Sequence, residues 1–315
     1  MEAVSIKSGE VTLSGHLHIP NEGGNKTALI LVGGRGCYAG ATQYDLYAKV
    51  LRRYGVSVLA YQKRGTGNST GDCGTATISD LADDVIAVKK YLENHPNGYE
   101  NIGVLGMSAG GWTMTKAAES TDFDFMISIV GPSTSVRDQQ LQSMRYGADL
   151  YGVKGEALEN VTRYTNLMFD AEANAKGFEK MEKLLASAAD ENWKDLLEDT
   201  DVAPDAEELD NLWVRRHNYD PKDVLSNYKK PFLAIYGQRD WIVPYKENIE
   251  LLEKYFTDRK ENLTTVVAYG AEHGMEMESK WVELENGQSY WHFFRISPQV
   301  KIELVNFLRG YDFIE

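Results

Sequence analysis

The sequence predicts an α/β fold, in which a mostly parallel central sheet carries helices on both faces and a helical cap is inserted into the chain. Uniformly apolar runs, typical of strands buried on both faces, alternate with helix-forming stretches in the first part of the chain. Residues 141–228 instead contain helix-like segments and no convincing strand. We therefore expect a core domain from residues 1–132 and 229–315, with residues 133–228 as the cap.

Local patterns place the elements of the core. Alternation of apolar and polar residues around Ser8-Gly9 predicts an antiparallel hairpin from residues 4–7 and 11–19. Thr77 followed by Asp80 has the spacing of a helix capping box. The predicted buried strands are 28–32, 56–61, 102–105, 125–130, 231–236 and 264–268, and the predicted core helices are 43–54, 77–92, 111–120, 247–255 and 298–308. The dipeptide Asn286-Gly287 predicts an added hairpin within residues 281–296.

The cap stretch is acidic. Residues 141–228 hold 19 Asp and Glu against 10 Lys and Arg, which is −9 of the chain's net charge of −14. Such a field disfavours anionic substrates if it covers the site entrance. Apolar residues such as Met168, Met181 and Leu185 lie on one face of each helix, and we expect those faces to favour acyl chains.

Two further expectations concern the ends of the cap helices. Asp205 before Glu208 predicts a cap for a helix running to Arg215. The glycines predicted to break helices are Gly147, Gly152, Gly155 and Gly177.

Charge and the first residues limit the partners. The net charge of −14 over 315 residues argues against nucleic acid or an anionic membrane surface as partner. Residues 1–10 lack the apolar segment of a signal peptide, and no run approaches the length of a membrane-spanning helix. We therefore expect a cytoplasmic protein that acts on a small molecule, with a homo-oligomer left open.

Cysteine and histidine usage indicates no metal site. Cys37 and Cys73 are too few for a disulfide framework. Both fall in loops on the same side of the predicted sheet, so a contact is possible, but we expect free thiols. No histidine pattern has the spacing of a zinc site, and we expect neither metal nor organic cofactor.

The motif with the most chemical content is Gly106-Met107-Ser108-Ala109-Gly110, a G-x-S-x-G between a predicted strand and a predicted helix. A serine on such a tight turn is held in a strained backbone conformation, and flanking glycines let strand and helix approach closely. The helix behind it directs backbone N–H groups towards an oxyanion. This setting predicts a nucleophilic serine at Ser108.

A nucleophilic serine needs a base and an acid that orients the base. Asp240 and His273, like Ser108, each come just after a predicted buried strand. Because the carboxyl ends of parallel strands meet at one edge of the sheet, we expect the three side chains to lie together. His292 is the rival base, but its aromatic neighbours favour a packed residue. Arg35, Arg64 and Arg239 could ring the site or serve structural roles.

In these motifs and their order the sequence resembles the α/β-hydrolase family, closest to bacterial carboxylesterases of the acyl-peptidase and dienelactone-hydrolase-like branch. The loop at residues 63–69 is similar to the family's R-G-x-G-x-S stretch, and Glu272-His273-Gly274 also matches. Gly33-Gly34 stands where many relatives have His-Gly. The resemblance implies that the backbone N–H groups of Arg35 and Ala109 form the oxyanion hole. We expect Met107, Gly34 and Trp241 to contact substrate.

These residues predict a serine hydrolase that cleaves carboxylic esters through an acyl-enzyme on Ser108, with His273 as base and Asp240 as orienting acid. An aminopeptidase, acyl-peptidase or thioesterase would use the same three residues. A third possibility is a ligand-binding homologue that has lost turnover, because fold alone does not establish activity.

Overall fold

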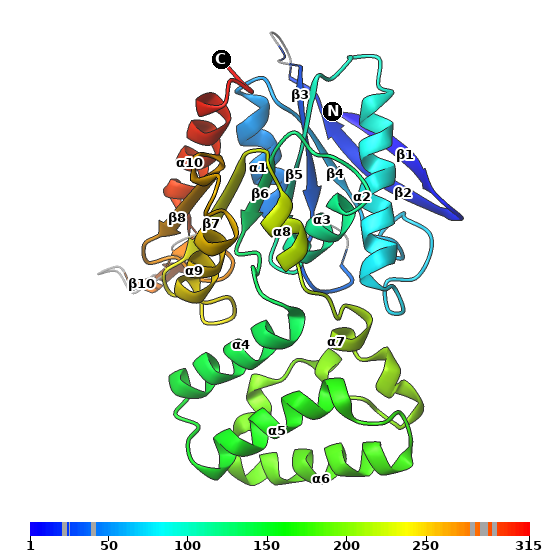
Figure 1. Cartoon of the computed structure of the whole chain (residues 1–315), viewed down its shortest axis with the longest axis vertical. Coiled ribbons are helices and arrows are strands. Elements are labelled where there is room, and N and C mark those ends of the chain that lie inside the picture. The colour runs from blue at the N-terminus through cyan, green and yellow to red at the C-terminus, as the bar shows by residue number, and fades with distance from the viewer. Residues whose placement is uncertain (21–23, 25, 39–41, 278–280, 284–288, 292–294) are drawn as a thin grey trace.

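The computed structural model describes residues 1–20, 24, 26–38, 42–277, 281–283, 289–291 and 295–315. Its centre is an eight-stranded sheet in the order β1-β2-β4-β3-β5-β6-β7-β8, parallel except for the pairs that involve β1 and β2 (Figure 1). The strands are β1 (Glu2–Ser8), β2 (Val11–His18), β3 (Thr27–Val32), β4 (Ser57–Tyr61), β5 (Asn101–Met107), β6 (Met126–Ile129), β7 (Phe232–Gly237) and β8 (Leu263–Ala268). The predicted α/β fold class is therefore confirmed.

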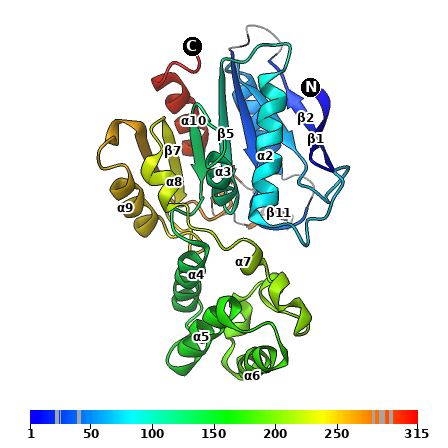
Figure 2. The same ribbon diagram turned by 45° about the vertical axis from the view of Figure 1, so that its right-hand side comes forward.

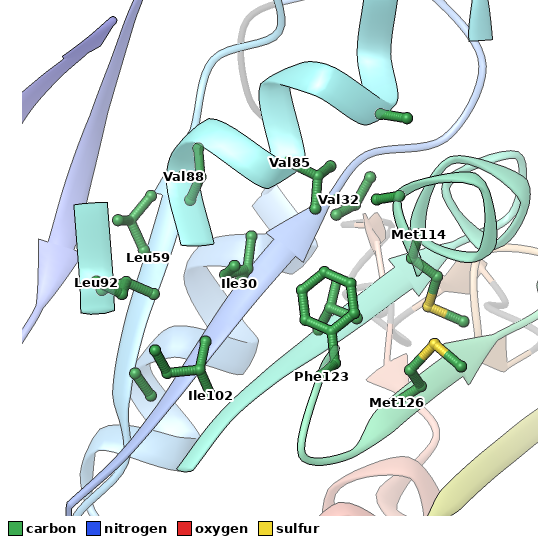
Figure 3. Packing of buried hydrophobic residues seen from close by; sticks show 14 of the residues in the cluster. Ile30, Val32, Leu59, Val85, Val88, Leu92, Ile102, Met114, Phe123 and Met126 are labelled. Atoms are coloured by element: carbon green, nitrogen blue, oxygen red, sulfur yellow. The ribbon is translucent and has the colours of Figure 1, made fainter. Parts of the chain in front are cut away.

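Successive residues of a strand point to opposite sides, so the uniformly apolar strands make both faces of the sheet apolar. Helices cover both of these faces. Ile30 of β3 packs with Val85 and Met114 on one face (Figure 3). The neighbouring Leu29 belongs to the cluster with Leu304 on the other face. The first face carries α2 (Ile78–Glu93), α3 (Gly110–Ala118), α8 (Lys222–Asn227) and α9 (Tyr245–Tyr255), and the second carries α1 (Thr42–Arg52) and α10 (Pro298–Gly310).

Local sequence signals of the core are found where they were predicted. Thr77 and Asp80 form the capping box of α2. The strand β10 (Trp281–Glu283) pairs with β11 (Ser289–Trp291), and β9 (Glu276–Met277) pairs with β12 (Arg295–Ile296). The predicted turn at Asn286-Gly287 lies outside the described residues, as does His292.

Between β6 and β7 the chain forms a helical layer beyond one end of the sheet (Figures 1 and 2). Its elements are α4 (Val136–Leu150), α5 (Glu156–Asp170), α6 (Ala175–Glu191), α7 (Trp213–Arg216) and the 3₁₀ turns η1 (Trp193–Leu196), η2 (Asp199–Asp201) and η3 (Glu207–Asn211). We call this layer, residues 136–216, the helical layer. The helix α8 is not part of the helical layer. Its Leu225 packs against the sheet, in the same cluster as Ile30 and Val85.

Gly152 and Gly155 lie between α4 and α5, as predicted, and Gly155 is the N-cap of α5, but three other expectations for this region are wrong. Gly147 and Gly177 lie inside α4 and α6, where a Cβ would come 2.8 Å from the Trp241 ring and 2.0 Å from the Glu172 carbonyl oxygen. These glycines serve close packing rather than helix ends. Asp205 does accept hydrogen bonds from two following amides, but the helix it caps is the short η3. Leu212 does not have a helical backbone conformation (ψ 135°), so the helix ends before it and Arg215 belongs to the separate helix α7.

The third wrong expectation is that the apolar faces of these helices favour the acyl chain of a substrate. Met168 and Met181 are almost fully buried within the helical layer's own core, and Leu185 packs against that core. Because α4, α5 and α6 cover one another's apolar faces, these side chains are not presented to substrate.

The expectation of free thiols is also wrong. Cys37 and Cys73 form a disulfide, which joins the loop after β3 to the loop before α2. The predicted sheet allowed a contact between these two loops, but the sequence separation of 36 residues did not indicate that the thiols are bonded.

Among the described residues, no helix is long and apolar enough to cross a membrane.

Candidate active site

The turn between β5 and α3 places Ser108 at the carboxyl edge of the sheet. Its φ of 52° lies in the left-handed region, which is strained for a residue with a side chain. The flanking glycines are required by close approach, because a Cβ at Gly106 would come 2.4 Å from the Gly110 carbonyl oxygen. A Cβ at Gly110 would come 2.5 Å from the Val32 carbonyl oxygen. The G-x-S-x-G pattern thus reflects the packing of α3 against β3 and β5.

A chain of hydrogen bonds joins the three residues that sequence order had placed together. Nε2 of His273 lies 2.9 Å from Oγ of Ser108, and Nδ1 of His273 lies 2.8 Å from Oδ2 of Asp240. The Asp240 side chain is fully buried, whereas that of His273 is 25% exposed. The backbone N–H groups of Ile242 and Val243 donate to the other carboxylate oxygen of Asp240, at 2.9 and 3.0 Å. The carboxylate is therefore fixed by its own loop.

Opposing effects act on the pKa of His273. Burial disfavours the imidazolium ion, but the charge and hydrogen bond of Asp240 favour it, with smaller contributions from Glu198 and Glu276. The net result is a pKa raised above the usual value of histidine. This environment suits an imidazole that accepts a proton.

The loop after β3 lies against the serine turn. A Cβ at Gly34 would come 3.2 Å from the Cβ of Ser108, so the backbone passes directly beside this serine. Within the part of the chain that the structure describes, no hydrogen bond uses the backbone N–H of Arg35 or of Ala109. Lys63 does not line the pocket but fixes this loop, since its ammonium group donates to the carbonyl oxygens of Gly34 at 2.6 Å and Gly36 at 2.9 Å.

The side chain of Arg35 links the same loop to the helical layer. It pairs with the buried carboxylate of Asp201 at 2.7 Å and with Glu198 at 3.1 Å. Its guanidinium also bonds to Thr200 and stacks 4.5 Å from the centroid of the Trp213 ring.

These groups surround a pocket of about 490 Å³. Gly34, Met107 and Trp241 line it, as predicted for substrate contacts. Trp112 lines it too, and its indole N–H donates to the Thr134 carbonyl. The helical layer supplies a polar wall, formed by Gln139, Gln140, Ser143, Asp195, Glu198 and Asp201, together with Met144, Leu196 and Leu197.

Not every predicted residue lies at the site. Arg64 makes two hydrogen bonds to the buried Asp84 carboxylate and another to Asp80, so it fixes α2. Arg239 lies near Glu272 at 3.6 Å and does not line the pocket. Over the described residues, no group of three or more His, Cys, Asp or Glu could hold a metal ion.

Sequence reasoning missed Lys63 and the polar wall. Lys63 immediately precedes the motif-like Arg64-Gly65, which was the only available signal. The carboxylates of Asp195, Glu198 and Asp201 carried no signal, because they belong to short 3₁₀ turns and their linkers in a uniformly acidic stretch.

The fold and this arrangement of residues define a serine hydrolase of the α/β-hydrolase class. Residues 9–273 match the model of the X-Pro dipeptidyl-peptidase (S15) family, so the chain belongs to that family and is an enzyme. A search among curated proteins finds no match.

Solved structures with the same fold include bacterial and archaeal esterases. An esterase of Pyrococcus furiosus aligns with a TM-score of 0.61 at 19% identity, over 98% of this chain and 90% of that one. A thermophilic esterase of Thermogutta terrifontis gives 0.56 at 18% identity, over 98% and 99%. A bromoperoxidase of Bacillus anthracis gives 0.57 at 15% identity, over 98% and 100%. At such identities these likenesses show the fold alone.

Proposed function

We propose that the enzyme hydrolyses carboxylic esters of small molecules through an acyl-enzyme on Ser108. The observation that carries this proposal is the hydrogen-bonded chain from Ser108 through His273 to Asp240 at the wall of an open pocket. The esterase names of several structural neighbours also support it.

The reaction follows from the geometry. As Oγ of Ser108 bonds to the ester carbonyl carbon, its proton moves to Nε2 of His273, and the imidazolium is stabilised by Asp240. The backbone N–H groups of Arg35 and Ala109 hold the tetrahedral oxyanion. The carbon–oxygen bond to the alcohol then breaks, and His273 returns the proton to the leaving oxygen. Water repeats the sequence on the acyl-enzyme and releases the acid.

A substrate series tests the ester preference. We expect p-nitrophenyl acetate and butyrate to be hydrolysed with a pre-steady-state burst of one p-nitrophenol per active site. Matched p-nitroanilides of the same acids should have a much lower kcat/KM. An anilide preference would contradict the ester proposal while leaving the nucleophile intact.

A second candidate, dipeptidyl-peptidase activity, is favoured by family membership and by one feature of the pocket. Asp195 and Glu198 are exposed on its polar wall, where a substrate α-ammonium group could pair with them. Glu198 already pairs with Arg35, so Asp195 is the better partner for an added cation.

Ala-Pro-p-nitroanilide distinguishes this candidate from the first. As a dipeptidyl peptidase the enzyme would cleave it faster than the N-acetylated analogue, and Asp195→Asn would raise KM for the free amine alone. As an esterase it would cleave both anilides slowly, and Asp195→Asn would leave the neutral ester unaffected.

The proposal includes a cytoplasmic location, and the Cys37–Cys73 disulfide is evidence against that location. Disulfides persist in oxidising compartments and are uncommon in the cytoplasm. Alkylation of thiols during cell lysis decides the matter. A cytoplasmic enzyme should yield Cys37 and Cys73 largely alkylated, whereas an exported enzyme should yield them disulfide-bonded.

A further inference from the structure

We propose that Lys63 is a positioning residue that orients and polarises the oxyanion hole from behind. The inference rests on the proposed function, because it takes the N–H of Arg35 as an oxyanion donor. Lys63 lies between β4 and α2, and it donates to Gly34 and Gly36 on the loop after β3.

Lys63 contacts the peptide group that joins Gly34 to Arg35. Its carbonyl oxygen, that of Gly34, accepts from Nζ of Lys63 at 2.6 Å. In a trans peptide the carbonyl and the N–H point in opposite directions across one plane. Fixing the carbonyl of Gly34 therefore fixes the direction of the Arg35 N–H.

The same hydrogen bond strengthens the donor. An ammonium ion at the carbonyl oxygen draws electron density across the peptide group, which makes the N–H a better hydrogen-bond donor. Gly34 itself leaves the loop without a side chain to hold it, because a Cβ there would press on the Cβ of Ser108. The bond to Gly36 supplies a second fixed point on the other side of Arg35.

The setting of Lys63 is unusual for a structural residue. Among the described residues no carboxylate pairs with it, and its bonds go to two backbone carbonyls. Burial lowers the pKa of Lys63 to about 8. A partly buried lysine paired only with neutral groups costs stability. A role in the oxyanion hole accounts for keeping it there.

Other ionisable groups share cavities with Lys63. These are Arg35, Tyr38, Tyr61, Glu208, Arg216 and His217. Burial lowers the pKa of His217 to about 3, and burial raises the pKa of Tyr38 above its usual value. Neither of these two groups therefore changes charge near pH 8, where Lys63 does.

The test compares Lys63→Met and Lys63→Gln with a matched control. The first removes the donor and keeps most of the side-chain volume, and the second keeps a neutral donor. Lys89→Met is the control, because Lys89 is at least as buried as Lys63 but pairs with Glu93 of the same helix, α2. Steady-state kinetics with p-nitrophenyl butyrate, the affinity of a phenylboronic acid and the thermal midpoint are measured for each protein.

Because the negative charge on the carbonyl oxygen is absent from the bound ester and develops only in the transition state and the tetrahedral intermediate, we expect Lys63→Met to lower kcat about 10- to 100-fold with KM changed less than about twofold. Boronate affinity should fall in parallel, and Lys63→Gln should show a smaller loss. In the native enzyme kcat should also decline above pH 8, and both Lys63 variants should lack that decline. Lys89→Met should match the native enzyme in every kinetic readout.

A kcat for a folded Lys63→Met within about twofold of the native value would overturn the inference, as would a loss that Lys89→Met shares. If Lys63→Met does not fold, the kcat of Lys63→Gln and the decline of kcat above pH 8 in the native enzyme test the inference instead. Failure of the proposed function looks different, because the native enzyme would then turn over no ester, or would do so without Ser108.

Discussion

At the scale of single residues, the environment of His273 makes a prediction about pH. The neutral imidazole is the base, so activity rises as pH rises through the pKa of this group. Because Asp240 raises that pKa, kcat/KM should rise through an apparent pKa above the usual 6.5 of histidine.

Asp240→Asn should move this limb to lower pH, since the carboxylate charge that favours the imidazolium is gone. It should also lower kcat about 10⁴-fold by favouring the wrong imidazole tautomer. Glu198→Gln is the matched control, because Glu198 raises the same pKa without touching the ring, and it should give only a small shift. A limb that stays in place in Asp240→Asn would show that another group is titrating.

The three residues of the hydrogen-bonded chain were predictable because each follows a buried strand of a parallel sheet. The sheet geometry then brings sequence-distant positions together without any knowledge of side-chain packing. Lys63 was not predictable in the same way, since its role depends on which carbonyl groups its ammonium reaches. The pairing of Arg35 with Asp201 depends on the approach of two segments that are far apart in the sequence.

At the scale of elements, the disulfide makes a prediction about stability. It closes a loop across a sequence separation of 36 residues. In the chain-entropy model a loop of this length stabilises the fold by about 3–4 kcal/mol. Cys37→Ser combined with Cys73→Ser should lower the free energy of unfolding by about that amount.

Urea unfolding with and without dithiothreitol checks this prediction. The native protein should lose stability on reduction, whereas the double variant should be insensitive to the reductant. Equal stability of the oxidised native protein and the double variant would mean that the disulfide does not stabilise the fold by lowering the conformational entropy of the unfolded chain.

Gly147 makes a second prediction at this scale. It lies within α4 against the Trp241 ring, so a Cβ there displaces a wall of the pocket. Gly147→Ala should destabilise the protein by about 1–3 kcal/mol through overpacking and should raise KM. The matched control is Gly310→Ala at the end of α10, where a Cβ would meet nothing within 4 Å. An increase in stability at Gly147 would contradict this packing argument.

The sequence could not distinguish a glycine that ends a helix from one that admits a neighbouring ring. Local propensity treats both as breaks, and the difference depends on tertiary contact. The strands and helices of the core were easier to place, because their apolar periodicity reflects burial on one or both faces.

At the scale of the whole molecule, charge predicts a substrate preference. The stretch 141–228 carries −9, and three of its carboxylates, those of Asp195, Glu198 and Asp201, line the pocket. Arg35 compensates only part of this charge. A polyanionic acyl-CoA should therefore be a poorer substrate than a neutral p-nitrophenyl ester of equal acyl length, and added salt should raise its kcat/KM by screening over about 8–10 Å.

Measurements of both substrates at low and high ionic strength check this. A preference for the acyl-CoA, or a rate that falls as salt rises, would make thioester hydrolysis the better function.

Fluorophosphonate labelling tests whether Ser108 is the nucleophile of this serine hydrolase. The native enzyme should be labelled at Ser108, as located by peptide mass spectrometry, with loss of esterase activity in proportion to labelling. Ser108→Ala should remain folded, resist labelling and lose about 10⁶-fold in kcat. Labelling of the alanine variant at the native rate, or ester turnover that survives the substitution, would contradict the account.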